Sequence, residues 1–387
     1  MHPQTLALHP ATQPSADFAA IPTAIHRAST VLYPTSQAWA QRHNGESAYV
    51  YGTMGTPTTR ALELAMAAND GGTGCVLVPS GLAALTLVNM ALLKSGDEVL
   101  IGDNGYEPNR SMFAGLFNKF GVTCKSFNPL DIASLNAAFT PATKLVWVEP
   151  VGSNTREVCD LRAIAASTHA NVHNNGAVLA SDHTYTAGVL LNVFDCGVDI
   201  AIQAMTKYPC GHSDALMGSV VWRDAAIGKA IHTARECLGY SVSPDECALM
   251  LRGLPTMRLR LAAQGTATTA LAQFLHTHPA VAEVLHPALP HCAGHDIWLR
   301  DYTGVATIFS FTLKPQYDIE AAHRLINALK LFGIGASWGG VHSLAIVQTI
   351  YRHTMPAPLG VLIRLQIGLE HADDLQADLA AALAGMG

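Results

Sequence analysis

The sequence predicts an α/β protein with a mostly parallel, seven-stranded sheet, followed by a smaller α+β domain. Short apolar segments alternate with amphipathic segments between residues 74 and 222, a pattern typical of strands covered on both faces by helices. This alternation ends near Leu254. The 387 residues, of which 49% are hydrophobic, exceed one ordinary domain and suffice for two buried cores.

Residues 1–56 contain proline, glycine and polar residues with little periodicity, which is typical of an extended arm. A helix is expected over Thr58–Ala68, because Pro57 stands at its start and Gly71 follows its end. We therefore predict an arm over 1–56, a large domain over 57–253 and a smaller domain over 254–387.

Seven strands are expected in the large domain, each an apolar run: Cys75–Val78, Glu98–Ile101, Val122–Phe127, Lys144–Val148, Ala177–Ser181, Asp199–Ala204 and Gly218–Trp222. The helices expected between them are Leu82–Leu93, Asn109–Phe120, Ile132–Phe139 and Leu161–Ala170. Ligands bind such sheets beyond the carboxyl ends of the strands. Polar residues follow those ends here: Ser80, Asp103, Tyr106, Glu149, Asp182 and Lys207.

The C-terminal part mixes the two periodicities. A long helix is expected over Thr256–His276, a strand over Ala306–Leu313 and a helix over Ile319–Leu331. Two further strands, Leu344–Gln348 and Leu362–Ile367, precede a closing helix. This order predicts an α+β domain.

Composition excludes several classes of function. A net charge of −6 without basic runs disfavours nucleic acid as a partner. The 18 histidines are scattered, and neither HExxH nor paired CxxC occurs, so we expect no metal site. Eight widely separated cysteines fit reduced thiols of a cytoplasmic protein. We expect neither a signal peptide nor a membrane span.

Lys207 is the first candidate for chemistry. The apolar strand that precedes it delivers a lysine to the sheet edge. Burying an amine is unfavourable unless its charge is lost or paired, and a Schiff base with an aldehyde cofactor is one solution. Taken alone, a surface lysine at a strand end is the more common arrangement.

Asp182 ends the strand before the one that leads to Lys207. A carboxylate there could pair with a protonated pyridine nitrogen, although turn aspartates are also common at such positions. Ser80, Gly81 and Leu82 connect a strand to a helix, and free N–H groups at a helix start bind phosphate. Thr206 could add a hydroxyl; the alternative is an ordinary N-cap at Ser80.

Tyr106 and Arg364 are candidates of a different kind. Tyr106 could stack on a cofactor ring or be an ordinary half-buried loop tyrosine. Arg364 lies among apolar residues of a strand. Its guanidinium needs an anion, either a substrate carboxylate or an internal acid.

Together these segments resemble the Cys/Met-metabolism family of pyridoxal 5′-phosphate (PLP) enzymes, most closely its cystathionine β-lyase branch. The resemblance runs from about Tyr49 to the C-terminal helix. It rests on the order and spacing of Tyr51–Arg60, Val78–Ala84, Asp199–Asp214, Val284–Pro290, Phe332–Gly340 and Arg364–Glu370. No glycine-rich dinucleotide motif follows the early strands, which disfavours a nicotinamide dehydrogenase.

The resemblance implies the PLP-dependent transferase-like fold of fold type I and a homotetramer. It implies that Lys207 holds PLP and moves the Cα proton, that Asp182 pairs with the ring nitrogen and that Tyr106 stacks on the ring. The phosphate would contact Gly81, Leu82 and Thr206. Tyr51 would reach the neighbouring subunit's site, and Arg364 with Ser337 would bind the substrate carboxylate.

Trp338 stands where the lyase branch tends to carry tryptophan, so we expect β-elimination of cystathionine or another S-substituted cysteine. Two alternatives remain open at this point. One is γ-elimination or γ-replacement by the same cofactor, and the other is a non-catalytic member that binds PLP.

Several positions depart from the family pattern. Thr53 and then Met54 stand where an arm arginine usually clamps the phosphate, and Arg156 is one candidate substitute. His183 stands where asparagine is usual, and His342 stands where the glutamate of a Gly-Gly-x-Glu pattern is common. Glu149-Pro150-Val151 replaces Glu-Ser-Pro. These departures leave the preferred substrate open.

Overall fold

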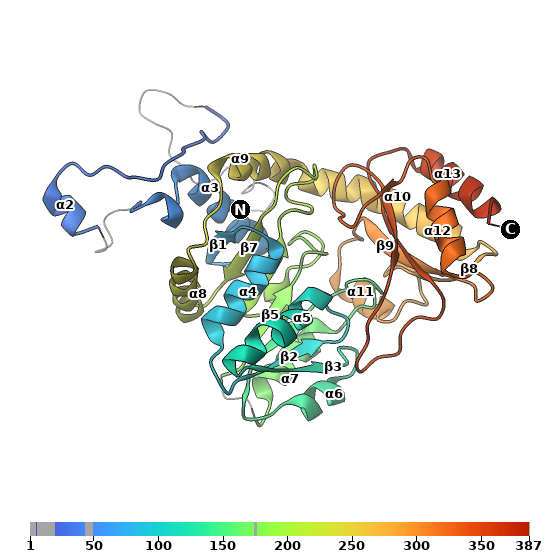
Figure 1. Cartoon of the computed structure of the whole chain (residues 1–387), viewed down its shortest axis with the longest axis horizontal. Coiled ribbons are helices and arrows are strands. Elements are labelled where there is room, and N and C mark those ends of the chain that lie inside the picture. The colour runs from blue at the N-terminus through green and yellow to red at the C-terminus, as the bar shows by residue number, and fades with distance from the viewer. Residues whose placement is uncertain (1–4, 6–19, 43–48, 174–175, 387) are drawn as a thin grey trace.

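The computed structural model of the chain describes residues 5, 20–42, 49–173 and 176–386, which form two β-sheets (Figure 1). The larger sheet has seven strands in the order β1-β7-β6-β5-β4-β2-β3. Its strands are β1 (Gly74–Val78), β2 (Glu98–Gly102), β3 (Thr123–Phe127), β4 (Thr143–Val148), β5 (Val178–Asp182), β6 (Ile200–Ala204) and β7 (Gly218–Trp222).

The prediction of a mostly parallel sheet is confirmed. Strands β6, β5, β4, β2 and β3 run parallel, and only β7 is antiparallel to its two neighbours, β1 and β6. The carboxyl ends of β2, β4, β5 and β6 therefore meet at one edge of the sheet. That edge is where Tyr106, Glu149, Asp182 and Lys207 emerge.

Helices cover both faces of the seven-stranded sheet and bury one apolar core on each face. They are α3 (Pro57–Asp70), α4 (Gly81–Leu92), α5 (Glu107–Gly115), α6 (Ile132–Ala138), α7 (Leu161–Ala170), α8 (Ala225–Leu238) and α9 (Pro244–Gly253). Short 3₁₀ turns cover Gly52–Met54, Phe117–Phe120, Val193–Cys196 and Leu254–Thr256.

The start of α3 follows the signals in its sequence. Thr56 and Thr59 form a capping box, and Pro57 occupies the first turn, where its missing N–H costs nothing. Gly71 adopts the left-handed conformation that ends the helix. Helix α3 in turn packs against β1 and β7 of the large sheet.

The second sheet has five strands in the order β10-β11-β12-β9-β8. They are β8 (Val281–Leu285), β9 (Ile308–Leu313), β10 (Gly333–Ile334), β11 (Leu344–Gln348) and β12 (Leu362–Gln366). Its helices are α10 (Met257–His276), α11 (His295–Asp301), α12 (Ile319–Ala328) and α13 (Ala372–Ala384). Helix α10 runs from the first sheet to the second across the upper part of Figure 1.

Several elements differ from the sequence expectation. Helix α5 ends at Gly115, because Leu116 leaves helical backbone geometry, and a 3₁₀ turn replaces its expected last turn. Helix α12 ends at Ala328, since Asp378 accepts the N–H groups of Lys330 and Leu331 at 3.0 and 2.8 Å. Strand β8 and helix α9 had no counterpart in the expectation.

Residues 20–42 make an exposed segment that includes α2 (Ser36–Ala40) and extends away from both sheets (Figure 1). None of its side chains is buried, and Leu32 is 90% exposed. Residues 1–4, 6–19 and 43–48 of the expected arm lie outside the described residues. The boundaries at 56/57 and 253/254 stay predictions. No helix in the described ranges is both long and apolar enough to span a bilayer.

Candidate active site

The N-terminus of α4 offers a site for an anion. The Ser80 side chain accepts the N–H of Ala83 at 3.0 Å, but within the described part of the chain the N–H groups of Gly81 and Leu82 have no acceptor. A Cβ on Gly81 would lie 2.6 Å from the Cβ of Ala204. This glycine therefore lets α4 begin against the end of β6, where unpaired N–H groups and the helix dipole favour phosphate.

Thr206 follows β6 at the same end of the sheet. Its hydroxyl oxygen accepts the N–H of Met217 at 3.1 Å, and the hydroxyl lies 3.3 Å from the carbonyl oxygen of Met217. This hydroxyl is thus held in place beside Lys207. A role in phosphate binding for Thr206 stays a prediction.

The amine of Lys207 is held by the segment that precedes β11. Its Nζ donates to the Ser337 hydroxyl at 2.9 Å and lies 5.2 Å from the centre of the Trp338 ring. Burial and the Arg364 cation lower the pKa of Lys207 to about 8, although Asp182 opposes them. A substantial neutral fraction at mild pH makes this amine a competent nucleophile and base.

Asp182 lies on the strand beside the one that leads to Lys207. Its Oδ1 accepts the N–H of Thr184 at 3.0 Å and the Thr184 hydroxyl at 2.6 Å, while Oδ2 has no partner among the described side chains. Burial raises the pKa of Asp182, and the bonds from Thr184 counteract it. The structure brings Asp182 and Lys207 together, as the sequence predicts.

Tyr106 follows β2 and caps the start of α5. Its backbone N–H donates to the carboxylate of Glu149 at the end of β4. A pocket beside the Tyr106 ring is lined by Leu85, Ile101, Gly105, Asn109, Trp147, Val148, Glu149 and Asp182. Burial, followed by the charge of Asp182, raises the pKa of Glu149 well above its usual value. Glu149 thus shares the pocket with Asp182 and fixes the Tyr106 backbone.

Arg364 lies in β12, paired with Ser310 of β9 and Ile346 of β11. Its guanidinium donates to the carbonyl oxygen of Ala336, next to Ser337. No carboxylate of the described residues lies within ion-pair distance of it, so the internal salt bridge considered above is not found there. Burial and the Arg156 cation lower the pKa of Arg364 to about 10. This side chain remains available to an anionic ligand.

Trp338 packs edge-on against Tyr208, with ring centres 5.3 Å apart. It thus forms an aromatic wall beside the Lys207 amine. Tyr51, in contrast, joins Thr30 through a backbone bridge, and its side chain is 48% exposed. The structure does not bring Tyr51 to the other site residues of its own chain. A role in a neighbouring subunit stays a prediction.

The backbone around Thr53 is tied to two arginines. Arg235 donates to the carbonyl oxygen of Thr53 at 3.1 Å, and Arg60 donates to that of Met54 at 2.9 Å. Sequence reasoning missed both, although Arg235 is a charged residue on the apolar face of α8. Arg156 instead donates to the carbonyl oxygen of Gly152 and, among the described residues, makes no contact with the α4 N-terminus.

The two unusual histidines differ in placement. His183 is buried, and its Nε2 lies 3.2 Å from Oδ2 of Asp70, whose Oδ1 accepts a hydrogen bond from Gln203 at 3.0 Å. His342 is exposed at the surface, with Nδ1 3.9 Å from Glu370. Only His183 therefore belongs to the buried surroundings of Asp182.

The residues present fit PLP. A phosphate fits the free N–H groups of Gly81 and Leu82, and a pyridinium nitrogen fits the unpartnered oxygen of Asp182. An aldehyde fits the amine of Lys207. The first group opens α4, the second ends β5 and the third follows β6, and β6 packs against both α4 and β5.

Comparison with known proteins agrees with this arrangement. Residues 4–384 match the profile of a family described as Cys/Met metabolism PLP-dependent enzyme. The chain is 38% identical over 373 residues to a cystathionine β-lyase of Escherichia coli (strain K12), covering 94% of each chain. It is 37% identical over 396 residues to a cystathionine β-lyase of Bordetella avium, covering 99% of this chain and 97% of that one.

Other relatives carry a different name. A cystathionine γ-lyase of Rattus norvegicus is 35% identical over 364 residues, covering 91% of this chain and 90% of that one. The crystal structure of a cystathionine γ-lyase from Lactobacillus plantarum, complexed with L-serine, superposes with a TM-score of 0.90 at 27% identity, covering 100% and 99% of the chains. This chain therefore shares its fold with that cystathionine γ-lyase.

Proposed function

This chain belongs to the Cys/Met metabolism family of PLP-dependent enzymes, and we propose that it catalyses β-elimination of cystathionine or a related S-substituted cysteine. It is a PLP-dependent carbon–sulfur lyase. With cystathionine and water, the products would be homocysteine, pyruvate and ammonia. The relatives that are named β-lyases at 37–38% identity favour this reaction.

The observation that carries the proposal is the Lys207 amine, held by Ser337 at the sheet edge beside Asp182. PLP, when bound, supplies an aldehyde and an electron-poor ring that stabilises negative charge at the substrate α-carbon. Lys207 would anchor the cofactor and then take the Cα proton. A pKa near 8 suits this base, because it is partly neutral at ordinary pH.

Asp182 would keep the cofactor ring charged by pairing its free Oδ2 with the ring nitrogen. Tyr106 would stack on the ring at the pocket that Asp182 and Glu149 also line. Gly81, Leu82 and Thr206 would hold the phosphate. The half-buried Glu149 would fix the Tyr106 backbone without contacting substrate.

Arg364 and Ser337 would bind the substrate α-carboxylate. Arg364 has no acidic partner in the part of the chain that the structure describes, and its planar guanidinium matches a carboxylate with two parallel hydrogen bonds. Ser337 would hydrogen-bond the same carboxylate when Lys207 moves towards the cofactor. Trp338 closes this side and is our reason for preferring β- over γ-elimination.

The exposed arm supports a shared active site. Residues 20–42 have no buried side chain, and several large apolar residues of this one segment are exposed, among them Ile21, Leu32 and Trp39, which is typical of a segment that packs on a partner. We propose that this segment packs on a second subunit, that Tyr51 reaches its site, and that such pairs form a homotetramer. We expect the enzyme to act in the cytoplasm.

The keto acid released from L-cystathionine tests the proposed reaction. β-Elimination gives pyruvate, whereas γ-elimination gives 2-oxobutyrate. We expect pyruvate and homocysteine in equal amounts from the purified enzyme loaded with PLP. Release of 2-oxobutyrate alone would establish the γ-lyase alternative, and no keto acid from cystathionine, cystine, S-alkylcysteines or acylhomoserines would establish the non-catalytic one.

A further inference from the structure

Asp103, which directly follows β2, binds the loop between β11 and β12 of the second sheet. Its buried carboxylate accepts three consecutive backbone N–H groups, those of His353 at 2.9 Å and of Thr354 and Met355 at 2.8 Å each. Burial alone would raise the pKa of Asp103, but these donors, aided by Arg110, hold it below its usual value. The carboxylate is thus an ionised anchor for residues more than two hundred positions away.

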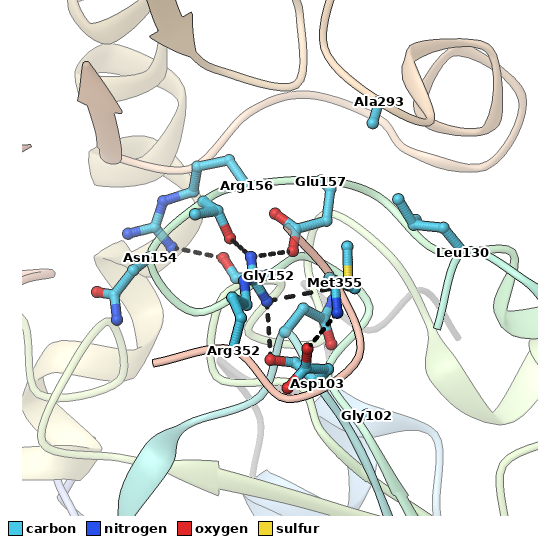
Figure 2. A network of polar contacts seen from close by, with 12 residues as sticks. Gly102, Asp103, Leu130, Gly152, Asn154, Arg156, Glu157, Ala293, Arg352 and Met355 are labelled. Atoms are coloured by element: carbon cyan, nitrogen blue, oxygen red, sulfur yellow. Dashed lines mark hydrogen bonds and ion pairs between the residues drawn. The ribbon is translucent and has the colours of Figure 1, made fainter. Parts of the chain in front are cut away.

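Arg352 completes this contact from the other side. Its guanidinium donates to the Asp103 carbonyl oxygen at 2.7 Å, to the Glu157 carboxylate at 2.6 Å and to the Thr155 hydroxyl. Figure 2 shows its guanidinium between Asp103 and Glu157. The side chains of Arg352 and Glu157 are each only 7% exposed. Such a shielded, multiply bonded arginine fixes geometry more firmly than a surface ion pair does.

These contacts join the segments that carry the site. Asp103 precedes Tyr106 in the loop after β2, and Thr155 and Glu157 lie in the loop that follows Glu149. Arg352 belongs to the β11–β12 loop (residues 349–361), which leads into the strand of Arg364. This loop is long for an antiparallel hairpin, whose connections usually have two to five residues.

A cavity lies between this loop and the large sheet, beside Tyr106. It is lined by Asp103, Asn104, Gly105, Glu107, Asn154, Thr155 and residues 348–352. The β11–β12 loop therefore covers the space next to the ring-stacking tyrosine.

We propose that Arg352 and Asp103 are positioning residues that hold the β11–β12 loop against the β2 and β4 loops, and so place Arg364 for the substrate carboxylate. Neither touches the atoms that hold PLP. This inference rests on the proposed function, because it assigns the substrate carboxylate to Arg364. Loosening the contact should weaken substrate binding and leave cofactor binding intact.

The test uses the PLP-loaded enzyme with the variants R352Q, R352K and D103N. We expect R352Q and D103N to raise KM for L-cystathionine at least about tenfold, with kcat changed less than about threefold and PLP affinity within about twofold. R352K should fall between R352Q and the natural enzyme, because lysine reaches fewer of the three acceptors. R223Q removes an arginine from the exposed pair Arg223–Asp195, away from the β11–β12 loop, and should change neither constant.

A double variant separates the loss of the contact from the effect of leaving a buried charge unpaired. R352Q leaves the buried Glu157 carboxylate without its partner and could reduce folding yield. The double variant R352Q/E157Q has no such charge and should still show the raised KM. An unchanged KM in D103N and R352Q/E157Q would overturn the inference, as would an equal loss of kcat, substrate affinity and PLP affinity.

Hydrogen exchange gives a readout that needs no turnover. The amides of His353, Thr354 and Met355 should exchange slowly in the natural enzyme and faster in D103N and R352Q/E157Q, with little change elsewhere. Rapid exchange of these amides in the natural enzyme would contradict the contact itself. Failure of the natural enzyme to release pyruvate would instead refute the proposed function and leave this readout standing.

Discussion

The amine of Lys207 lies 2.9 Å from the hydroxyl of Ser337. One residue follows a strand of the seven-stranded sheet, and the other precedes a strand of the five-stranded sheet. The contact places the candidate base beside the candidate carboxylate site. Because Ser337 is uncharged, Lys207 can exchange it for another partner without leaving an unpaired charge behind.

Replacement of Ser337 by alanine should lower kcat/KM for L-cystathionine roughly threefold to tenfold, the effect of one lost hydrogen bond. PLP affinity should not change, because Lys207, Asp182 and the α4 N-terminus remain. Steady-state kinetics and PLP titration of the apoenzyme measure both effects. An S337A enzyme with natural kinetics would remove Ser337 from the site.

The lowered pKa of Lys207 predicts a pH dependence for cofactor loading. Only the neutral amine attacks an aldehyde, and the neutral fraction rises as pH passes about 8, the pKa of this lysine. The rate at which apoenzyme takes up PLP should therefore increase with pH and level off above that value. The R364Q variant should shift the midpoint upward, since the Arg364 cation helps to lower this pKa.

Arg364 provides the sharpest test of substrate binding. R364K keeps a positive charge but loses the paired donors, so KM for L-cystathionine should rise about 10- to 100-fold. R364Q should be worse, and neither should weaken PLP binding beyond a small factor. Natural KM values in R364K would assign the carboxylate to another group.

Gly81 tests the phosphate site without touching charged residues. In G81A the new Cβ would stand 2.6 Å from the Ala204 Cβ, so the α4 N-terminus must shift. We expect the dissociation constant for PLP to rise about tenfold, in line with the effect of overpacking. G115A is the matched control, because nothing lies within 4 Å of its added Cβ. Equal PLP affinity in both variants would contradict the assignment.

A substitution in the arm is expected to strengthen PLP binding rather than weaken it. Thr53 is exposed and stands where the family resemblance implies a phosphate-clamping arginine. If the arm reaches a neighbouring site, T53R should lower the dissociation constant for PLP about tenfold, the effect of one charge-assisted contact. T277R, at another exposed threonine, should not.

The sequence was most informative where chemistry lies at strand ends. Apolar runs located β1 to β7 along the chain, and the parallel direction expected for neighbouring strands was enough to bring Asp182 and Lys207 to one edge of the sheet. Arg364 was recognisable as a cation among apolar neighbours.

Other features depend on contacts that no local pattern encodes. Arg352 and Asp103 are far apart in sequence, so no local sequence pattern predicts their contact. Arg156 was a plausible substitute for the arm arginine only until its fully buried contact with Gly152 was visible. Helix α12 ends earlier than expected because Asp378, from a helix distant in sequence, accepts the N–H groups of Lys330 and Leu331. The role proposed for Tyr51 involves a second subunit, so the contacts within one chain do not test it.

Reduction of the PLP-loaded enzyme with borohydride, followed by peptide mass spectrometry, tests the central claim most directly. Reduction fixes the cofactor to the amine that holds it. The account predicts a pyridoxyl adduct on the peptide that contains Lys207, and neither an adduct nor cystathionine turnover in K207A. An adduct on a different lysine, or undiminished pyruvate release by K207A, would contradict it.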